Sequence, residues 1–193
     1  MSDAALKQDE GEFTFADYLI WDDEERWELI DGKAYMISSP TPFHQNISSK
    51  LGFQLNWFLQ GKPCQVYEAL GVRLFPRFDQ RDNTFVVPDI AVVCDRAKLY
   101  GGFCNGPPNL IVEILSPSTA ENDLEGGEKF LHYQEAGVPE YWIVDPQNRT
   151  VDVNILRAGR YAGTNYDKTQ SIPVQVLPGC VIDMPMLWAS VWE

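Results

Sequence analysis

Long apolar stretches are missing from this chain of 193 residues. No apolar run approaches the roughly 20 residues that a membrane span needs. The first residues, MSDAALKQDEGE, also lack the basic flank and the apolar segment of a secretory signal. We therefore expect a cytoplasmic protein without membrane contact.

Basic side chains are scarce, because 15 Lys and Arg stand against 28 Asp and Glu and leave a net charge of −13. A protein that binds nucleic acid through charge alone carries a basic face. The charge balance therefore argues against tight, non-specific DNA binding. It does not exclude a nucleic-acid binder, because catalytic acids need a metal ion to screen them and the 15 Lys and Arg can still gather on one face.

The chain has few cysteines, and they are widely spaced. Cys64, Cys94, Cys104 and Cys180 form no CxxC pair and match no zinc or disulfide framework. We expect them to be isolated, reduced thiols.

Internal repeats and low-complexity tracts are absent from the sequence, and its length suits one substantial core better than two. We expect a disordered N-terminus over residues 1–12 and one domain over residues 13–193. Within that domain, apolar periodicity and turn formers predict an α/β chain. The expected elements are a short helix capped by Thr14, hairpin strands 26–30 and 33–37, a helix over 46–60, strands within 64–76, 84–93 and 109–116, a helix over 123–136, strands 138–146 and 150–156, and short C-terminal strands.

Two of the apolar runs carry a carboxylate near the middle. TFVVPDIAVV contains Asp89, and NLIVEILS contains Glu113. A buried ionised carboxylate costs several kcal/mol unless it is paired, hydrogen-bonded or bound to a cation. Two such acids on neighbouring strands predict a shared positive partner, and a divalent metal is the first candidate. Pro88 cannot donate to a strand ladder, so we expect an irregularity there that re-aims Asp89.

Carboxylates of this kind suit metal-assisted phosphodiester hydrolysis, because Mg²⁺ prefers oxygen ligands and keeps several waters. The residues alone leave two alternatives. Buried acids also pair with Arg or Lys in structural networks, and two carboxylates can act as acid and base in a metal-free hydrolase such as a glycosidase.

Several motifs together resemble the bacterial family of putative restriction endonucleases in the PD-(D/E)xK nuclease superfamily. They occur in order between residues 18 and 187: WELIDG, SPTPFHQNIS, VVPDIAVV, PNLIVEILSPST and GVPEYWIVDP. The resemblance implies a restriction-endonuclease-like α/β (α+β) core. Its central mixed β-sheet would be flanked by helices, with an extra N-terminal hairpin and C-terminal strands.

The resemblance also implies a metal pair. Pro88-Asp89 is similar to the PD element, and Glu113 to the acid of the second element. Both would bind Mg²⁺, for which Mn²⁺ could substitute.

The superfamily's lysine usually stands two residues after the second acid, but this chain has Leu115 there. The resemblance points instead to Lys129 on the following helix, although the pair at residues 126–127 is two glycines and would weaken the first turn of that helix. Glu28 resembles an additional acidic member of the site. His44, at the start of a predicted helix, resembles a substrate-binding histidine.

We therefore expect a Mg²⁺-dependent endonuclease that hydrolyses phosphodiester bonds of DNA and acts as a homodimer. The alternative is a catalytically inactive nuclease-fold protein that binds nucleic acid or protein. The missing lysine at position 115 and the acidic composition favour this alternative.

Overall fold

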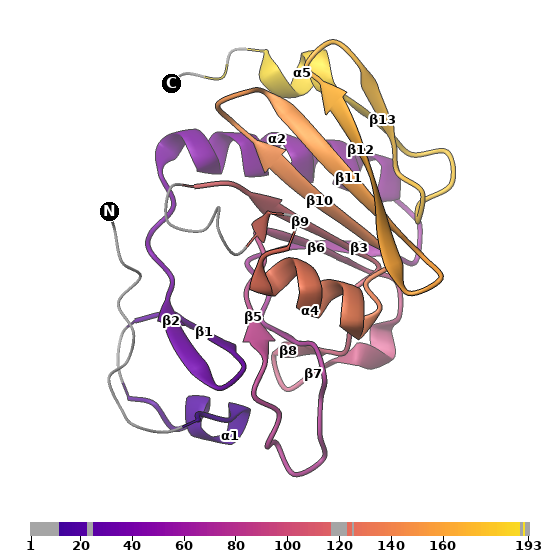
Figure 1. The fold of residues 1–193 in the computed structure, drawn as a ribbon. Helices are drawn as coiled ribbons and strands as arrows, with labels where there is room; N and C mark the ends of the chain where they lie inside the picture. Colours follow the sequence, from indigo (N-terminus) through magenta and orange to yellow (C-terminus); the bar gives the residue numbers. More distant parts are fainter. Residues whose placement is uncertain (1–11, 23–24, 117–122, 125, 190, 192–193) are drawn as a thin grey trace.

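The computed structural model describes residues 12–22, 25–116, 123–124, 126–189 and 191, so the predicted disorder up to residue 11 lies outside the described residues. The fold is a mixed α/β structure (Figure 1). Its helices are α1 (Phe15–Tyr18), α2 (Pro42–Leu59), the 3-10 helix η1 (Arg96–Lys98), α4 (Glu128–Ala136) and α5 (Met184–Trp188). Its strands are β1 (Trp27–Ile30), β2 (Lys33–Met36), β3 (Gln65–Glu68), β4 (Val72–Arg73), β5 (Phe85–Val86), β6 (Ile90–Val93), β7 (Leu99–Tyr100), β8 (Phe103–Asn105), β9 (Leu110–Ile114), β10 (Glu140–Asp145), β11 (Thr150–Arg157), β12 (Arg160–Asp167), β13 (Ser171–Pro173) and β14 (Val181–Asp183).

The N-terminal elements match their prediction. The backbone N–H of Thr14 donates to Asp17 Oδ2 at 2.8 Å, which caps α1. Asp31 and Gly32 both have positive φ, at 49° and 77°, as a tight turn between β1 and β2 requires. The predicted capped helix and hairpin are therefore confirmed.

Twelve of these strands divide between two six-stranded sheets, and β13 and β14 pair in a small third sheet, whereas the sequence predicted one central sheet. The first sheet has the order β2-β1-β5-β4-β8-β7, and the second has the order β12-β11-β10-β9-β6-β3. Two of the expected segments, 64–76 and 84–93, each break into two strands, and the two strands of each segment join different sheets. Gly71 separates β3 from β4, and Pro88 with Asp89 separates β5 from β6.

The second sheet is covered on both faces. Alternate residues of its strands pack on α2 and the C-terminal segments on one face and on α4 on the other (Figure 1). β9 and β10 are parallel, and α4 forms the crossover between them, as predicted. Trp142 and Tyr141 on β10 are fully buried on opposite faces, which confirms this segment as a core strand.

Two helices differ from their predicted limits at the N-terminal end. α2 begins at Pro42, because Thr41 caps the helix and accepts from the His44 N–H at 3.2 Å. α4 begins at Glu128 and not near Asp123, because Gly126 has a φ of 86° and Gly127 takes the extended N-cap conformation. Its predicted end at Gly137 is confirmed by a left-handed C-cap.

The prediction of four reduced cysteines is wrong for two of them. Cys64 and Cys94 form a disulfide with a Cα–Cα distance of 3.9 Å. The reason is the antiparallel register of β3 and β6, which pairs Gln65 with Val93. Cys64 precedes Gln65 and Cys94 follows Val93, so the two cysteines lie opposite each other. Cys104 and Cys180 are free, as predicted, and both are buried.

The segment between β6 and β9 holds η1 and the β7–β8 hairpin, where the sequence indicated only a connection. In the part of the chain that the structure describes, no helix is both long enough and apolar enough to span a membrane.

Candidate active site

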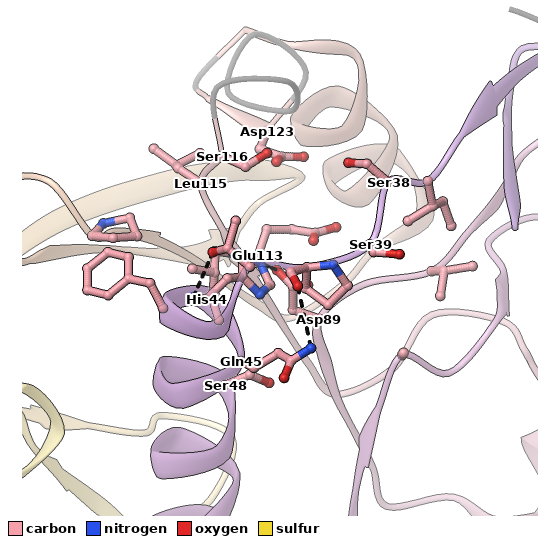
Figure 2. Close-up of a pocket in the computed structure, with 18 of the residues that line it drawn as sticks. Ser38, Ser39, His44, Gln45, Ser48, Asp89, Glu113, Leu115, Ser116 and Asp123 are labelled. Carbon is pink, nitrogen blue, oxygen red and sulfur yellow. Dashed lines mark hydrogen bonds and ion pairs between the residues drawn. The ribbon is translucent and has the colours of Figure 1, made fainter. Parts of the chain in front are cut away.

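The five residues selected from the sequence lie in one cleft of about 1210 Å³. The cleft is bounded by the β1–β2 hairpin, the first turns of α2, and the segments that follow β9 and β10. Figure 2 shows His44, Asp89 and Glu113 grouped near the start of α2, with Ser38 and Ser39 on another wall. The five residues, which come from different elements of the fold, are Glu28, His44, Asp89, Glu113 and Lys129.

Asp89 occupies the break between the two sheets, directly after Pro88. Its Oδ2 accepts a hydrogen bond from the Ile114 N–H at 2.7 Å and contacts His44 Nε2 at 3.1 Å. Its backbone oxygen accepts from the Ala69 N–H at 3.2 Å, which ties it to the end of β3. The side chain remains 24% exposed, so a ligand in the cleft can reach it.

Glu113 is buried within β9, on the face that α4 covers. Its Oε1 accepts hydrogen bonds from Tyr133 Oη at 2.7 Å and from Lys129 Nζ at 3.1 Å. Burial raises the pKa of Glu113 well above its ordinary value, and the nearby carboxylates raise it further, while Lys129 lowers it. This carboxylate is therefore held rigidly in a place that penalises its charge.

Lys129 stands among three carboxylates. Its Nζ lies 3.0 Å from Glu28 Oε1, 3.1 Å from Glu113 Oε1 and 3.6 Å from Asp123 Oδ1. Burial alone would lower the pKa of Lys129, but these carboxylates outweigh it and raise the pKa well above its ordinary value. The ammonium group is thus charged at neutral pH and can donate hydrogen bonds.

Glu28 links the hairpin to the rest of the site. Its Oε1 accepts from the Val87 N–H at 2.7 Å and also contacts Lys129. Glu28 therefore fixes both the lysine and the segment that leads into Asp89.

His44 lies in the first turn of α2, with its ring directed to Asp89. Burial lowers the pKa of His44, but the hydrogen bond and the charge of Asp89 prevail and raise it above the ordinary value. The pair is therefore an ion pair over a wider pH range than an isolated histidine would allow.

Two members of the site were not selected from the sequence. Asp123 was expected only as the start of a helix, yet its side chain is 1% exposed and lies beside Lys129. Tyr133 was expected only to face the core, yet its hydroxyl holds Glu113. Their spacing from Lys129 gave no signal, because Asp123 precedes α4 and Tyr133 looks like an ordinary core residue of that helix.

A magnesium ion fits the oxygen donors of this cleft. Among the described residues, the hydrogen bonds to Asp89 and Glu113 end on Oδ2 and Oε1, which leaves the other oxygen of each carboxylate for a cation. No group of three or more His, Cys, Asp or Glu among the described residues could enclose a metal, so a closed zinc site does not fit. Magnesium commonly takes one or two carboxylates and keeps waters.

The charge of the cleft also suits a cation. The lining residues include six carboxylates, against two basic residues and His44. These residues are Glu28, Glu68, Asp89, Glu113, Asp123 and Asp145, with Arg26 and Lys129 as the basic ones. An anionic substrate would be repelled from such a cleft unless a cation entered with it.

Comparisons with known proteins agree with one another. Residues 15–185 match the family model Uma2, described as "Putative restriction endonuclease". An uncharacterized protein of Synechocystis sp. is 26% identical over 140 residues, which cover 71% of this chain and 70% of that protein. The crystal structure of a putative nuclease of DUF820 from Anabaena variabilis has a TM-score of 0.74 at 21% identity and covers 93% of this chain and 99% of its own, which shows a shared fold.

Proposed function

Because the chain belongs to the Uma2 family of putative restriction endonucleases, we propose that it is a magnesium-dependent endonuclease that hydrolyses phosphodiester bonds of DNA. The observation that carries the proposal is the meeting of Glu28, His44, Asp89, Glu113 and Lys129 in one cleft, although 101 positions separate the first from the last. In this proposal the second sheet and α4 form the restriction-endonuclease-like core. The β1–β2 hairpin and the C-terminal strands are additions to that core.

Asp89 and Glu113 are the proposed metal ligands. Each offers one oxygen while its other oxygen is held by the protein, so neither side chain must reorganise to bind. When bound, Mg²⁺ would polarise the phosphate and lower the pKa of a coordinated water. Mn²⁺ shares the preference for oxygen ligands and is the expected substitute.

Lys129 is proposed to stabilise negative charge on the scissile phosphate and to orient the attacking water. It is charged and donates hydrogen bonds, so it would serve as a fixed electrostatic group and not as the base. Glu28 keeps the lysine in place through its 3.0 Å contact. His44, which is 16% exposed, is proposed to donate to a phosphate oxygen of the substrate.

The test is cleavage of plasmid and linear duplex DNA by purified protein with Mg²⁺, with Mn²⁺, and with a chelator. We expect metal-dependent cleavage that Asp89→Asn abolishes, because the amide loses one charged ligand. Glu135→Gln, an exposed acid on the outer face of α4, is the matched control and should leave cleavage unchanged. Absence of cleavage with either metal, or equal cleavage after Asp89→Asn, would refute the proposal.

Two observations favour a second function. Leu115 replaces the lysine of the usual superfamily pattern, and Lys129 is engaged by three carboxylates. These features favour a nuclease-fold protein that binds nucleic acid or protein without cleaving. DNA binding without Mn²⁺ uptake would identify this function.

A further inference from the structure

The most exposed side of α2 carries no charge, and Lys50 at its edge is half-buried and donates to the Ala189 carbonyl. All seven exposed residues of this 18-residue helix are uncharged: Pro42, Gln45, Asn46, Ser49, Phe53, Asn56 and Trp57. This set is called the α2 outer face below. In a chain with a net charge of −13, an uncharged surface of this length is an exception that needs a physical reason.

Two aromatic side chains dominate the α2 outer face. Phe53 is 54% exposed and Trp57 is 67% exposed, and their stacked rings have centroids 6.2 Å apart. With 100° per residue, Phe53 projects almost directly away from the buried residues Leu51 and Leu55. Exposed aromatics combined with a lack of charge are typical of the centre of a protein–protein interface.

We propose that two copies of this chain pair through the α2 outer face, with the two helices antiparallel across a two-fold axis near Phe53. A second copy fits for an electrostatic reason. Two molecules that each carry a charge of −13 repel, and they can approach most easily where neither presents a carboxylate. Nucleic acid fits less well, because the exposed residues of the face include no basic side chain and Lys50 at its edge already donates to the Ala189 carbonyl.

The shape of the face is self-complementary in this arrangement. Phe53 meets its own counterpart at the axis, because a two-fold contact brings a central residue against itself. Four residues to either side, the large Trp57 of one copy lies opposite the small Ser49 of the other. Such alternation lets two helices approach to the usual distance of about 8–10 Å.

The contact extends beyond α2. A helix of 18 residues is about 27 Å long. One face of such a helix offers less surface than the roughly 800 Å² that each partner buries in a typical interface. Met186 on α5 and Val181 on β14 are 49% and 56% exposed, and both elements contact α2. Their apolar side chains would enlarge the contact, with the exposed Asp183 of β14 at its margin.

The arrangement places the two clefts apart. His44 precedes Phe53 by nine residues, so each cleft lies about 14 Å along the helix from the axis, toward opposite ends of the helix pair. The dimer does not depend on nuclease activity, and its test uses no cleavage assay.

The test is sedimentation velocity over a range of protein concentrations. We expect the wild-type chain to dimerise and both Phe53→Glu and Phe53→Lys to be monomeric, because each places like charges against each other at the axis. An equimolar mixture of the two variants should recover the dimer, since Glu then faces Lys. Phe53 is half exposed, so circular dichroism should show both variants folded.

Leu131→Glu is the matched control, because Leu131 is 51% exposed on α4, which covers the opposite face of the second sheet. It should leave the dimer intact. A monomeric wild-type chain, a dimer unaffected by either Phe53 variant, or failure of the mixture to dimerise would each overturn the proposal. Loss of oligonucleotide binding in Phe53 variants of a monomeric chain would assign the face to nucleic acid instead.

Discussion

At the scale of single residues, the candidate site is defined by an imbalance of buried charge. Glu28, Glu113 and Asp123 surround Lys129 and are each less than about a tenth exposed. One ammonium group cannot neutralise three carboxylates, which leaves a deficit of positive charge. Burial raises the pKa of Glu113 most, and the neighbouring carboxylates raise it further although Lys129 lowers it. The same deficit makes the site receptive to a divalent cation.

Replacing Lys129 by Met should destabilise the fold. The change leaves buried carboxylates without their cation, and breaking a buried pair in this way costs about 3–5 kcal/mol. Urea unfolding in the presence of a chelator measures the loss. Lys168→Met, at an exposed position, should change stability by less than about 0.5 kcal/mol. Adding Glu113→Gln to Lys129→Met should recover part of the loss, and a loss equal to that of the control would contradict the buried network.

Tyr133→Phe should weaken metal binding without removing a ligand. The hydroxyl holds Oε1 of Glu113, and loss of such an outer contact typically lowers metal affinity by about 10–100-fold. Calorimetric titration with Mn²⁺ gives the affinity. Tyr161→Phe is the control, because its hydroxyl donates to the Val138 carbonyl at 2.9 Å, outside the set of site residues. Equal affinities in the two variants would show that Tyr133 does not position Glu113.

At the scale of elements, the cleft exists because two segments change sheets. Gly71 lies between β3 and β4, and Pro88 lies between β5 and β6, where the chain passes from one sheet to the other. Asp89 therefore lies at a junction where the backbone is not paired in a ladder and the side chain can leave the sheet surface. If β5 and β6 formed one continuous strand, the Asp89 side chain would have to point to one face of a single sheet.

The disulfide between Cys64 and Cys94 predicts how many thiols react under each condition. With a thiol reagent near pH 8, the folded, unreduced protein should show almost no reaction. Burial raises the pKa of both Cys104 and Cys180 to about 11, so only about a thousandth of each thiol is ionised. Denaturation should reveal two thiols, and reduction should reveal all four. Four thiols in denatured, unreduced protein would contradict the disulfide.

At the scale of the whole molecule, the acidic composition and the cleft are connected. The net charge of −13 opposes contact with a polyanion. The carboxylates that line the cleft increase this repulsion at the site itself. A bound divalent cation would lower the charge where the substrate must approach. The acidic composition is therefore consistent with the metal dependence proposed above.

Magnesium should stabilise the folded chain. A ligand that binds only the native state adds about 2.7 kcal/mol when present at 100 times its dissociation constant. Chemical unfolding with Mg²⁺, compared with NaCl at equal ionic strength, measures the increment. The double variant Asp89→Asn with Glu113→Gln should show no increment. An equal increment in wild type and double variant would place the bound ion elsewhere.

The sequence by itself determined most of the elements, although not η1 or the β7–β8 hairpin, and two of the five residues selected for the site. Apolar alternation and turn residues predicted the β1–β2 hairpin and the β9–α4–β10 crossover, because these depend on local spacing. Asp89 and Glu113 were found because an acid inside an apolar run conflicts with burial. The other three site residues came from the resemblance, and the structure brings all five together.

Only the tertiary structure decided what depends on pairing between distant segments. The register of β3 and β6 set the Cys64–Cys94 disulfide, which a separation of 30 residues could not reveal. The division into two sheets followed from where each strand found a partner. Asp123 and Tyr133 belong to the site because α4 packs on β9 and brings Lys129 and its neighbours next to Glu113. Local spacing in the sequence does not predict this proximity. Sequence patterns report the environment of each residue, whereas packing decides which of those environments become neighbours.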